Sequence, residues 1–225
     1  MHIWQVALDV PEEGIRQLEG VLSRDEIERA NRFHFARDRR RFIVARVELR
    51  RVLGRYLSVA PAEIRFEYNA FGKPALAADP QEMDLRFNLS HSEELAIIAI
   101  TQSREVGIDL EFLKAETATT DIAQRFFAPG EIKQLNLAST EQQQALFYRF
   151  WTRKEAFIKA IGQGVSFPLD QVDTSEQMGE EWSMVKATEE GWTAQKWMGL
   201  DLALPDGFLG ALVVEGTGCE LIRHE

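Results

Sequence analysis

Two neighbouring carboxylates in "VGIDLE" are spaced so that they could hold a cation together. Asp109 and Glu111 lie two residues apart in what reads as a strand, so both side chains project to one face, while Ile108 and Leu110 occupy the other. Side-by-side carboxylates repel each other, and a hard divalent cation bound through oxygen removes that repulsion. Taken alone, an Asp-x-Glu pair is more commonly a solvated strand edge.

A third carboxylate, Glu155, lies where its helix should be apolar. The stretch "FWTRKEAFIKAIGQG" reads as a helix that ends at glycine. At about 100° per residue, Glu155 projects only about 40° from Trp151 and about 60° from Ile158. A carboxylate beside these side chains needs a cation, a metal or a hydrogen-bond network to stay ionised. Lys159 follows one turn later, so an ordinary i,i+4 ion pair is the alternative to a Mg²⁺ site shared with the "VGIDLE" pair.

Two further stretches, "FGKPAL" and "FNLSHSEEL", add a cation and hydrogen-bonding groups. Lys73, between glycine and proline, is held on a stiff turn from which it could reach a phosphate. Ser90 and His91 follow a predicted strand, where a ligand could approach them, although a lone histidine is usually structural or simply exposed. Nothing marks an activated serine, so the sequence supports no Ser-His-Asp triad.

Arginine is concentrated in one segment of an otherwise acidic chain. The net charge is −10, which argues against general nucleic-acid binding. Residues 24–55 nevertheless hold eleven arginines and no lysine against five acidic residues, a local balance of +6. Such a run favours forked recognition of phosphate or carboxylate. The alternative is a solvated helix face with i,i+4 pairs, which would place Arg46 and Arg50 on the outside.

The composition is that of a soluble globular protein. The chain has 225 residues, of which 45% are hydrophobic and 28% charged. Its longest strongly apolar run, "LAIIAI", is far shorter than the roughly 20 residues of a membrane span. No signal peptide is visible in "MHIWQVALDVPEEG", and Cys219 is the single cysteine, so we expect no internal disulfide and a cytoplasmic location.

The elements that must position these residues follow one order twice. A strand at 2–9 is followed by a helix that Ser23 and Glu26 begin with a capping box, and by a helix at 38–57. Strands are expected at 64–69, 85–90, 95–101 and 106–111, and helices at 120–127, 129–137 and 141–162. An antiparallel meander should close the chain, with strands at 181–187, 191–198, 207–214 and 219–224. The pattern predicts an α+β fold with two similar-sized halves, residues 1–104 and 105–225.

Five blocks in order resemble the signatures of the Sfp-type 4′-phosphopantetheinyl transferases. These blocks are "FGKPAL", "FNLSHS", "VGIDLE", "RFFAPGE" and "FWTRKEAFIKAIGQGVSFPL", and they cover roughly residues 70–170. The segment "RFHFARDRRRFIVARVELR" resembles the coenzyme A-binding first half of that family less specifically. The resemblance implies a pseudo-twofold α+β monomer that binds coenzyme A between its halves. Such an enzyme moves the phosphopantetheine arm to a serine of an acyl or peptidyl carrier protein and releases adenosine 3′,5′-bisphosphate.

The resemblance also implies a catalytic centre. Mg²⁺ would be held against the coenzyme A pyrophosphate by Asp109, Glu111 and Glu155. Lys159 would neutralise charge on the pyrophosphate as the phosphoanhydride breaks, and His91 completes the expected catalytic set. Glu155 is also the candidate that accepts the serine proton, directly or through water. Positioning and electrostatic stabilisation are what phosphoryl transfer chiefly requires.

By the same resemblance, the nucleotide of coenzyme A would be held by basic and polar side chains. Ser90, His91, Lys159, Lys73 and Arg41 would position its 3′-phosphate, adenosine and pyrophosphate. The family often has two basic residues on the first helix for the 3′-phosphate. Arg29 fits one of these positions, but Glu26 occupies the other, which departs from the pattern.

Two other functions remain open on the sequence. The chain could be a non-catalytic relative that binds coenzyme A or docks carrier proteins, or an unrelated Mg²⁺-dependent phosphohydrolase. For a transferase, we expect residues 112–127, which follow the carboxylate strand, to contribute to carrier docking, unless Phe126 and Phe127 are ordinary core.

Overall fold

A computed structural model describes residues 1–77, 84–114, 119–164, 167–178, 181–182 and 197–224. The first half of the chain folds as a main sheet and a separate two-stranded sheet, with helices. After β1 (His2–Ala7) come α1 (Glu12–Glu19), α2 (Arg24–Ala30) and α3 (Ala36–Leu57), then β2 (Phe66–Tyr68), β3 (Pro74–Leu76), β4 (Leu85–Ser92) and β5 (Leu95–Gln102). The helix α1 was not anticipated from the sequence, whereas the capping box that begins α2 is confirmed.

The second half repeats this plan. It contains β6 (Val106–Phe112), α4 (Thr119–Phe126), α5 (Pro129–Leu137), α6 (Thr140–Ile161), β7 (Gln177–Met178), β8 (Glu181–Trp182), β9 (Trp197–Asp201) and β10 (Phe208–Glu215). The chain ends with β11 (Ile222–His224). In the first sheet the strands run β11-β1-β5-β4, and in the second β6-β10-β9-β8-β7, while β2 pairs with β3. In the first sheet β1 lies beside β5, and β5 lies beside β4. In the second sheet β6 lies beside β10, and β10 lies beside β9. The predicted α+β class with a repeated element order is confirmed.

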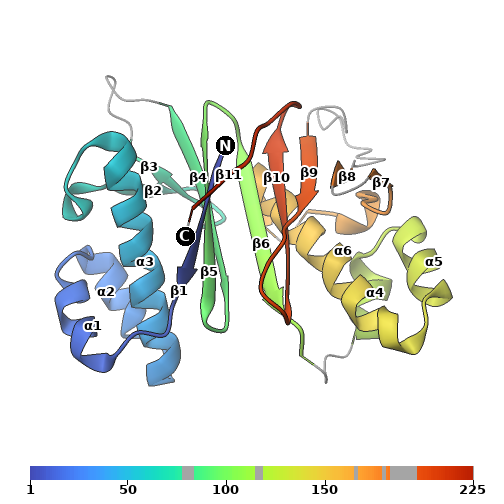
Figure 1. Cartoon of the computed structure of the whole chain (residues 1–225), viewed down its shortest axis with the longest axis horizontal. Coiled ribbons are helices and arrows are strands. Elements are labelled where there is room, and N and C mark those ends of the chain that lie inside the picture. Colours follow the sequence, from blue (N-terminus) through green and yellow to red (C-terminus); the bar gives the residue numbers. More distant parts are fainter. Residues whose placement is uncertain (78–83, 115–118, 165–166, 179–180, 183–196, 225) are drawn as a thin grey trace.

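The two sheets lie together in the middle of the molecule, and helices cover their outer faces (Figure 1). Between the sheets, Ile97 and Ala99 of β5 share a buried cluster with Ile108 and Leu110 of β6. On the outer faces, α3 packs on the first sheet, and α6 packs on β6 and β10 of the second. Asp109 therefore belongs to a strand with the inter-sheet core on one side and α6 on the other.

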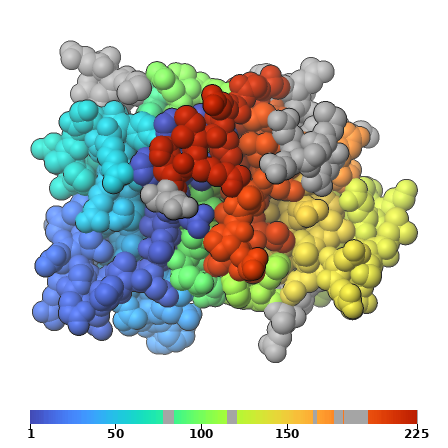
Figure 2. All heavy atoms as spheres, in the orientation of Figure 1, coloured from blue at the N-terminus to red at the C-terminus, as the bar shows by residue number. Residues whose placement is uncertain are grey.

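The C-terminal strand β11 (Ile222–His224) differs from the expected meander. It pairs in parallel with β1 of the first half, with His2 opposite Ile222 and Trp4 opposite His224. The Trp4 and His224 rings are stacked 4.1 Å apart. In Figure 2 the C-terminal segment, in red, lies over the middle of this face, between the two halves. Most of the expected strands at 181–187 and 191–198 lies outside the described residues.

Candidate active site

The close approach of α6 to β6 depends on Gly107. A Cβ atom at Gly107 would lie 2.0 Å from the carbonyl oxygen of Ala156 and 2.2 Å from the amide nitrogen of Ala160. Glycine is therefore required where the two backbones meet. Because the helix lies this close, the Lys159 ammonium reaches the strand and donates to Asp109 Oδ1 at 2.5 Å.

A row of polar side chains on β4 faces β6 from the other half. Asn88, Ser90 and Ser92 form this row, while the alternate residues Leu85, Phe87 and Leu89 pack toward α3. Asn88 Oδ1 accepts from the Ile108 N–H at 2.9 Å. Ser90 Oγ accepts from the N–H of residue 110 at 3.4 Å. Ser92 Oγ accepts from the N–H of residue 112 at 3.1 Å. The row connects the edges of the two sheets through side chains.

The same serines also touch the carboxylates of β6. Ser90 Oγ donates to Asp109 Oδ1 at 3.0 Å, and Ser92 Oγ donates to Glu111 Oε2 at 3.1 Å. Lys159 Nζ lies 3.0 Å from Ser90 Oγ, so Ser90 belongs to the carboxylate cluster. Sequence reasoning named Ser90 from "FNLSHS" but missed Ser92 and Asn88. The alternation of polar residues at 86, 88, 90 and 92 is the signal that could have identified them.

The cluster carries more negative charge than its surroundings stabilise. The pKa of Glu155 is raised to about 7, chiefly by burial and also by the negative charges of Asp109 and Glu111, against the opposing effect of Lys159. Burial and the charge of Asp109 also raise the pKa of Glu111, while the hydrogen bond from Ser92 lowers it. An added cation would relieve this repulsion.

The chemistry of the cluster fits a divalent cation bound through oxygen. Asp109 Oδ2 is buried and has no hydrogen-bond partner among the described residues, while Lys159 occupies the other oxygen of the same carboxylate. Carboxylate oxygens are the ligands that Mg²⁺ prefers. Within the described ranges, however, no three or more His, Cys, Asp or Glu side chains are already grouped closely enough to hold an ion. The assignment of Asp109, Glu111 and Glu155 as ligands therefore stays a prediction.

The structure places His91 near three of the expected cations. Desolvation lowers the pKa of His91 although the residue is partly exposed, and the positive charges of Lys159, Arg29 and Arg41 lower it further. The guanidinium of Arg41 is already paired, with Asp9 at 2.8 and 3.1 Å and with Glu93 at 2.9 Å. A phosphate bound by Arg41 would compete with these carboxylates.

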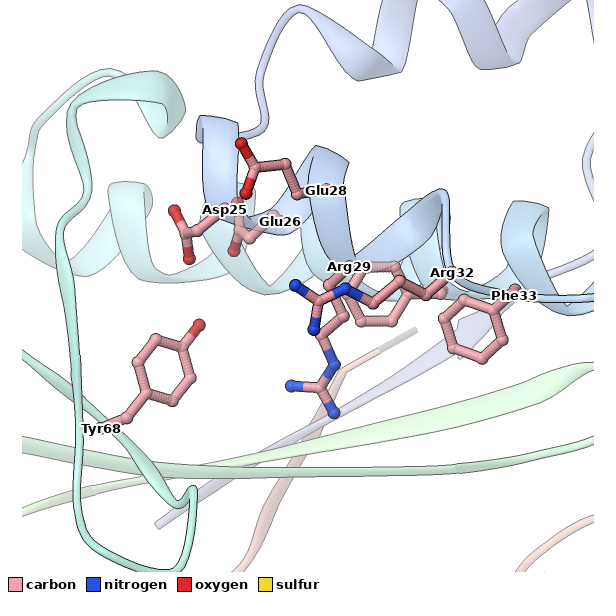
Figure 3. A pocket seen from close by; sticks show the side chains of 8 residues that line it. Asp25, Glu26, Glu28, Arg29, Arg32, Phe33 and Tyr68 are labelled. Atoms are coloured by element: carbon pink, nitrogen blue, oxygen red, sulfur yellow. The ribbon is translucent and has the colours of Figure 1, made fainter.

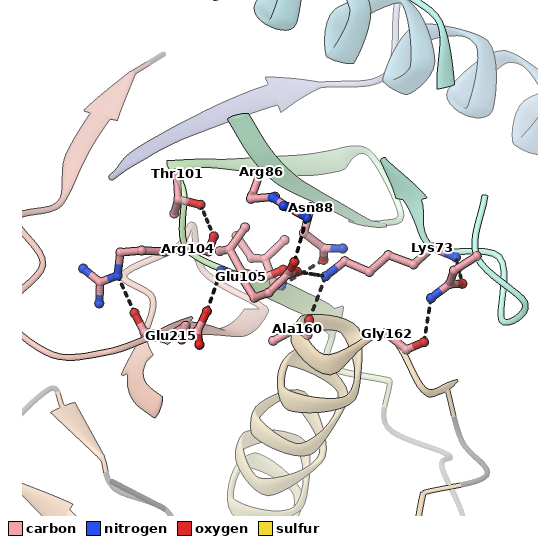
Figure 4. Close-up of polar contacts among 12 residues, drawn as sticks. Lys73, Arg86, Asn88, Thr101, Arg104, Glu105, Ala160, Gly162 and Glu215 are labelled. Carbon is pink, nitrogen blue, oxygen red and sulfur yellow. Dashed lines mark hydrogen bonds and ion pairs between the residues drawn. The ribbon is translucent and has the colours of Figure 1, made fainter. Parts of the chain in front are cut away.

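Lys73 connects the first half to the end of α6. Its ammonium donates to Glu105 Oε2 at 2.8 Å and to the Ala160 carbonyl at 2.7 Å, as Figure 4 shows. In the same turn, Asn69 Nδ2 donates to the Gly162 carbonyl at 2.8 Å. The two side chains satisfy carbonyl groups that the last turn of a helix leaves without partners. Contact between Lys73 and a phosphate would compete with this capping.

Two adjacent cavities run from the carboxylate cluster toward α2. One, of about 350 Å³, is lined among others by Arg29, Phe71, Lys73, Glu155 and Lys159. The next, of about 580 Å³, is also lined by Arg29, together with Arg32, Phe33 and Tyr68, and both arginines extend into it (Figure 3). Three acidic residues line it as well, namely Asp25, Glu26 and Glu28. The arginines and aromatic rings suit an anionic ligand that carries a flat ring, provided that its charge lies away from these carboxylates.

Glu26 has a structural partner set. It is 1% exposed, and its carboxylate accepts from Arg46 Nε at 2.9 Å and from Arg50 Nε at 2.8 Å. The outward placement considered for Arg46 and Arg50 is therefore wrong, because both guanidinium groups turn toward α2. Such a buried carboxylate pairs with protein cations, which explains its departure from the basic residue that the family pattern often has there.

No helix in the described residues is long and apolar enough to cross a membrane.

A family model described as the 4′-phosphopantetheinyl transferase superfamily matches residues 105–204, and one described as 4′-phosphopantetheinyl transferase, N-terminal, matches residues 11–103. The chain is 40% identical to the 4′-phosphopantetheinyl transferase HetI of Nostoc sp., over 97% of this chain and 89% of that protein. It is 34% identical to the 4′-phosphopantetheinyl transferase Sfp of Bacillus subtilis, over 76% and 74% of the two chains. The solved holo-[acyl-carrier-protein] synthase of Thermotoga maritima matches 51% of this chain and 64% of its own, with 22% identity and a TM-score of 0.42.

Proposed function

This chain belongs to the 4′-phosphopantetheinyl transferase superfamily as an Sfp-like member, and from that premise we propose a Mg²⁺-dependent reaction with coenzyme A. The phosphopantetheine arm passes from coenzyme A to a serine of an acyl or peptidyl carrier protein. The observation that carries this proposal is that three features adjoin one another. They are the crowded carboxylates, the Lys159 ammonium and a cavity lined by basic residues.

The reaction requires one bond to form and one to break. The carrier serine oxygen bonds to the pantetheine-side phosphorus, the phosphoanhydride breaks, and adenosine 3′,5′-bisphosphate leaves. The serine proton goes to Glu155, directly or through water, with the carboxylate acting as general base. Lys159 supplies positive charge where charge develops on the leaving group.

The bound ion would be held by Asp109, Glu111 and Glu155, and when present it neutralises the pyrophosphate. Arg29 lines both cavities, so it is placed to meet the 3′-phosphate end of the nucleotide. His91 lies close enough to Arg29 and Lys159 for their charges to lower its pKa, and it would contact the phosphates from the strand side. All of these groups come from one chain, so we propose that the monomer suffices.

Intact-mass spectrometry of apo carrier proteins tests the proposal. A panel of acyl and peptidyl carriers is incubated with the chain, coenzyme A and Mg²⁺, with and without chelator. We expect a chelator-sensitive gain of one phosphopantetheine on the carrier serine, with one adenosine bisphosphate released per carrier. The Glu155→Gln variant should lose this activity, whereas Glu141→Gln, an exposed change at the start of the same helix, should keep it.

Three results would contradict the proposal or a part of it. Coenzyme A binding without transfer to any carrier would favour a non-catalytic binding relative. Carrier-independent release of free phosphate would indicate a phosphohydrolase. Undiminished transfer by Glu155→Gln would remove the role given to that carboxylate.

A further inference from the structure

Ser92 uses a single hydroxyl for two contacts that cross the junction of the halves. Its Oγ donates to Glu111 Oε2 at 3.1 Å and accepts the Phe112 N–H, also at 3.1 Å. The second contact fixes the hydroxyl relative to the β6 backbone. The first then fixes one oxygen of the carboxylate that precedes Phe112 in the chain.

The position of Ser92 is itself firmly determined. It is the last residue of β4 and pairs with Leu95 across a two-residue turn, in which Glu93 has a φ of 47°. The Glu93 carboxylate is held from both halves, by Arg41 at 2.9 Å and by Lys114 at 3.1 Å. A hydroxyl at the end of such a hairpin has little freedom to follow a moving carboxylate.

Glu111 needs such a partner more than an ordinary surface carboxylate does. Its carboxylate is half-buried on the same face of β6 as that of Asp109, two residues earlier. A donor on one oxygen restricts rotation of the carboxylate, which leaves the other oxygen for a ligand. Ser90 makes the corresponding contact with Asp109, but it also meets Lys159, so its substitution would disturb the cation as well.

We propose that Ser92 is a positioning residue that orients the Glu111 carboxylate toward the divalent cation. This inference rests on the proposed function, since it presumes that Glu111 is a ligand. Ser92 has no contact with the reacting atoms in this role; it acts through Glu111. The polar row of β4 then has two purposes, since it joins the sheets and aims the acids of β6.

The inference is tested by measuring the binding of Mn²⁺ alone to the chelator-treated full chain. Binding is detected as the loss of the electron paramagnetic resonance signal of free Mn²⁺. Ser92→Ala should weaken Mn²⁺ binding about tenfold, as is typical when a hydrogen-bond partner of a metal ligand is lost. Ser92→Thr keeps the hydroxyl and should retain the wild-type affinity. Ser139→Ala is the matched control, because that hydroxyl caps the far end of α6, and its loss should lower stability without changing Mn²⁺ affinity.

A double-mutant cycle separates positioning from a general loss of structure. If Ser92 acts through Glu111, adding Ser92→Ala to Glu111→Gln should cause no further loss of Mn²⁺ affinity. A further tenfold loss in that background would overturn the inference. The inference would also be overturned if Ser92→Ala bound Mn²⁺ with wild-type affinity and still modified carriers. That result would leave the proposed function intact. A wild-type chain that neither binds Mn²⁺ nor modifies any carrier would overturn both.

Discussion

Replacing Glu155 with glutamine should stabilise the metal-free protein at alkaline pH even though it removes activity. The folded chain raises the pKa of this carboxyl from 4.5 to about 7. At about 1.4 kcal/mol per pKa unit, the ionised form costs the folded state at most about 3 kcal/mol. Because Glu155 keeps some contact with solvent, screening makes this an upper bound, and about 1 to 3 kcal/mol is expected.

The sign of the pH dependence follows from the raised pKa. Below about pH 4.5 the carboxyl is protonated in both the folded and the unfolded chain, so the substitution changes the free energy of unfolding little. Above about pH 7 it is ionised in both states, and the folded state bears the whole penalty. The stabilisation by Glu155→Gln should therefore grow through this range and be largest near pH 8.

Urea unfolding at pH 5 and pH 8, in the presence of chelator, measures this difference directly. The Glu141→Gln variant should change the free energy of unfolding by no more than about 0.5 kcal/mol at either pH, because that side chain is exposed. An equal midpoint for Glu155→Gln and wild type at pH 8 would refute the reasoning. So would a stabilisation of the same size at both pH values, since that could not come from ionisation.

Three further substitutions test the fold and the partner surface. Gly107→Ala should destabilise the chain by about 3 kcal/mol or more in urea unfolding, because the new Cβ would meet the Ala156 carbonyl at 2.0 Å. Its control is Gly14→Ala, which should be neutral or slightly stabilising because nothing lies within 4 Å of the new Cβ. Glu26→Gln should cost about 3 kcal/mol by the same assay, because two buried guanidinium groups lose their ionised acceptor, and an unchanged midpoint would contradict that account. Arg125→Glu, an exposed change on α4, should raise the Michaelis constant for an acidic carrier protein and leave that for coenzyme A unchanged; equal changes in both would argue against docking there.

Local patterns in the sequence predicted the elements of the site well. The alternation in "VGIDLE" placed Ile108 and Leu110 in the core, and the structure confirms this. Gly162 was expected to end the long helix, and it does so with a φ of 71°. For the docking segment, Phe127 is ordinary core at 2% exposure, so any contact there must come from its exposed neighbours. These features depend on residues close in sequence, which is why one sequence suffices for them.

Partners from distant segments could not be predicted in this way. The helical period of α3 alone gave no indication that Glu26 of α2 would draw Arg46 and Arg50 inward. Likewise, the turn that carries Lys73 reads as one from which it could reach a phosphate, yet its ammonium caps a helix almost ninety positions later in the chain. In each case the deciding interaction is an ion pair or hydrogen bond across the fold, which local propensity does not encode.

The pairing of β11 with β1 affects how the chain can fold during synthesis. His2 pairs with Ile222, a residue that is made 220 positions later in the chain. At roughly 5 to 20 residues per second, the outer edge of β1 waits about 10 to 40 s for its neighbour. Throughout that interval the edge presents unpaired N–H and C=O groups that could pair with another nascent chain. The first half can thus assemble its helices and core on the ribosome, but its sheet stays open to misassembly until β11 has been made.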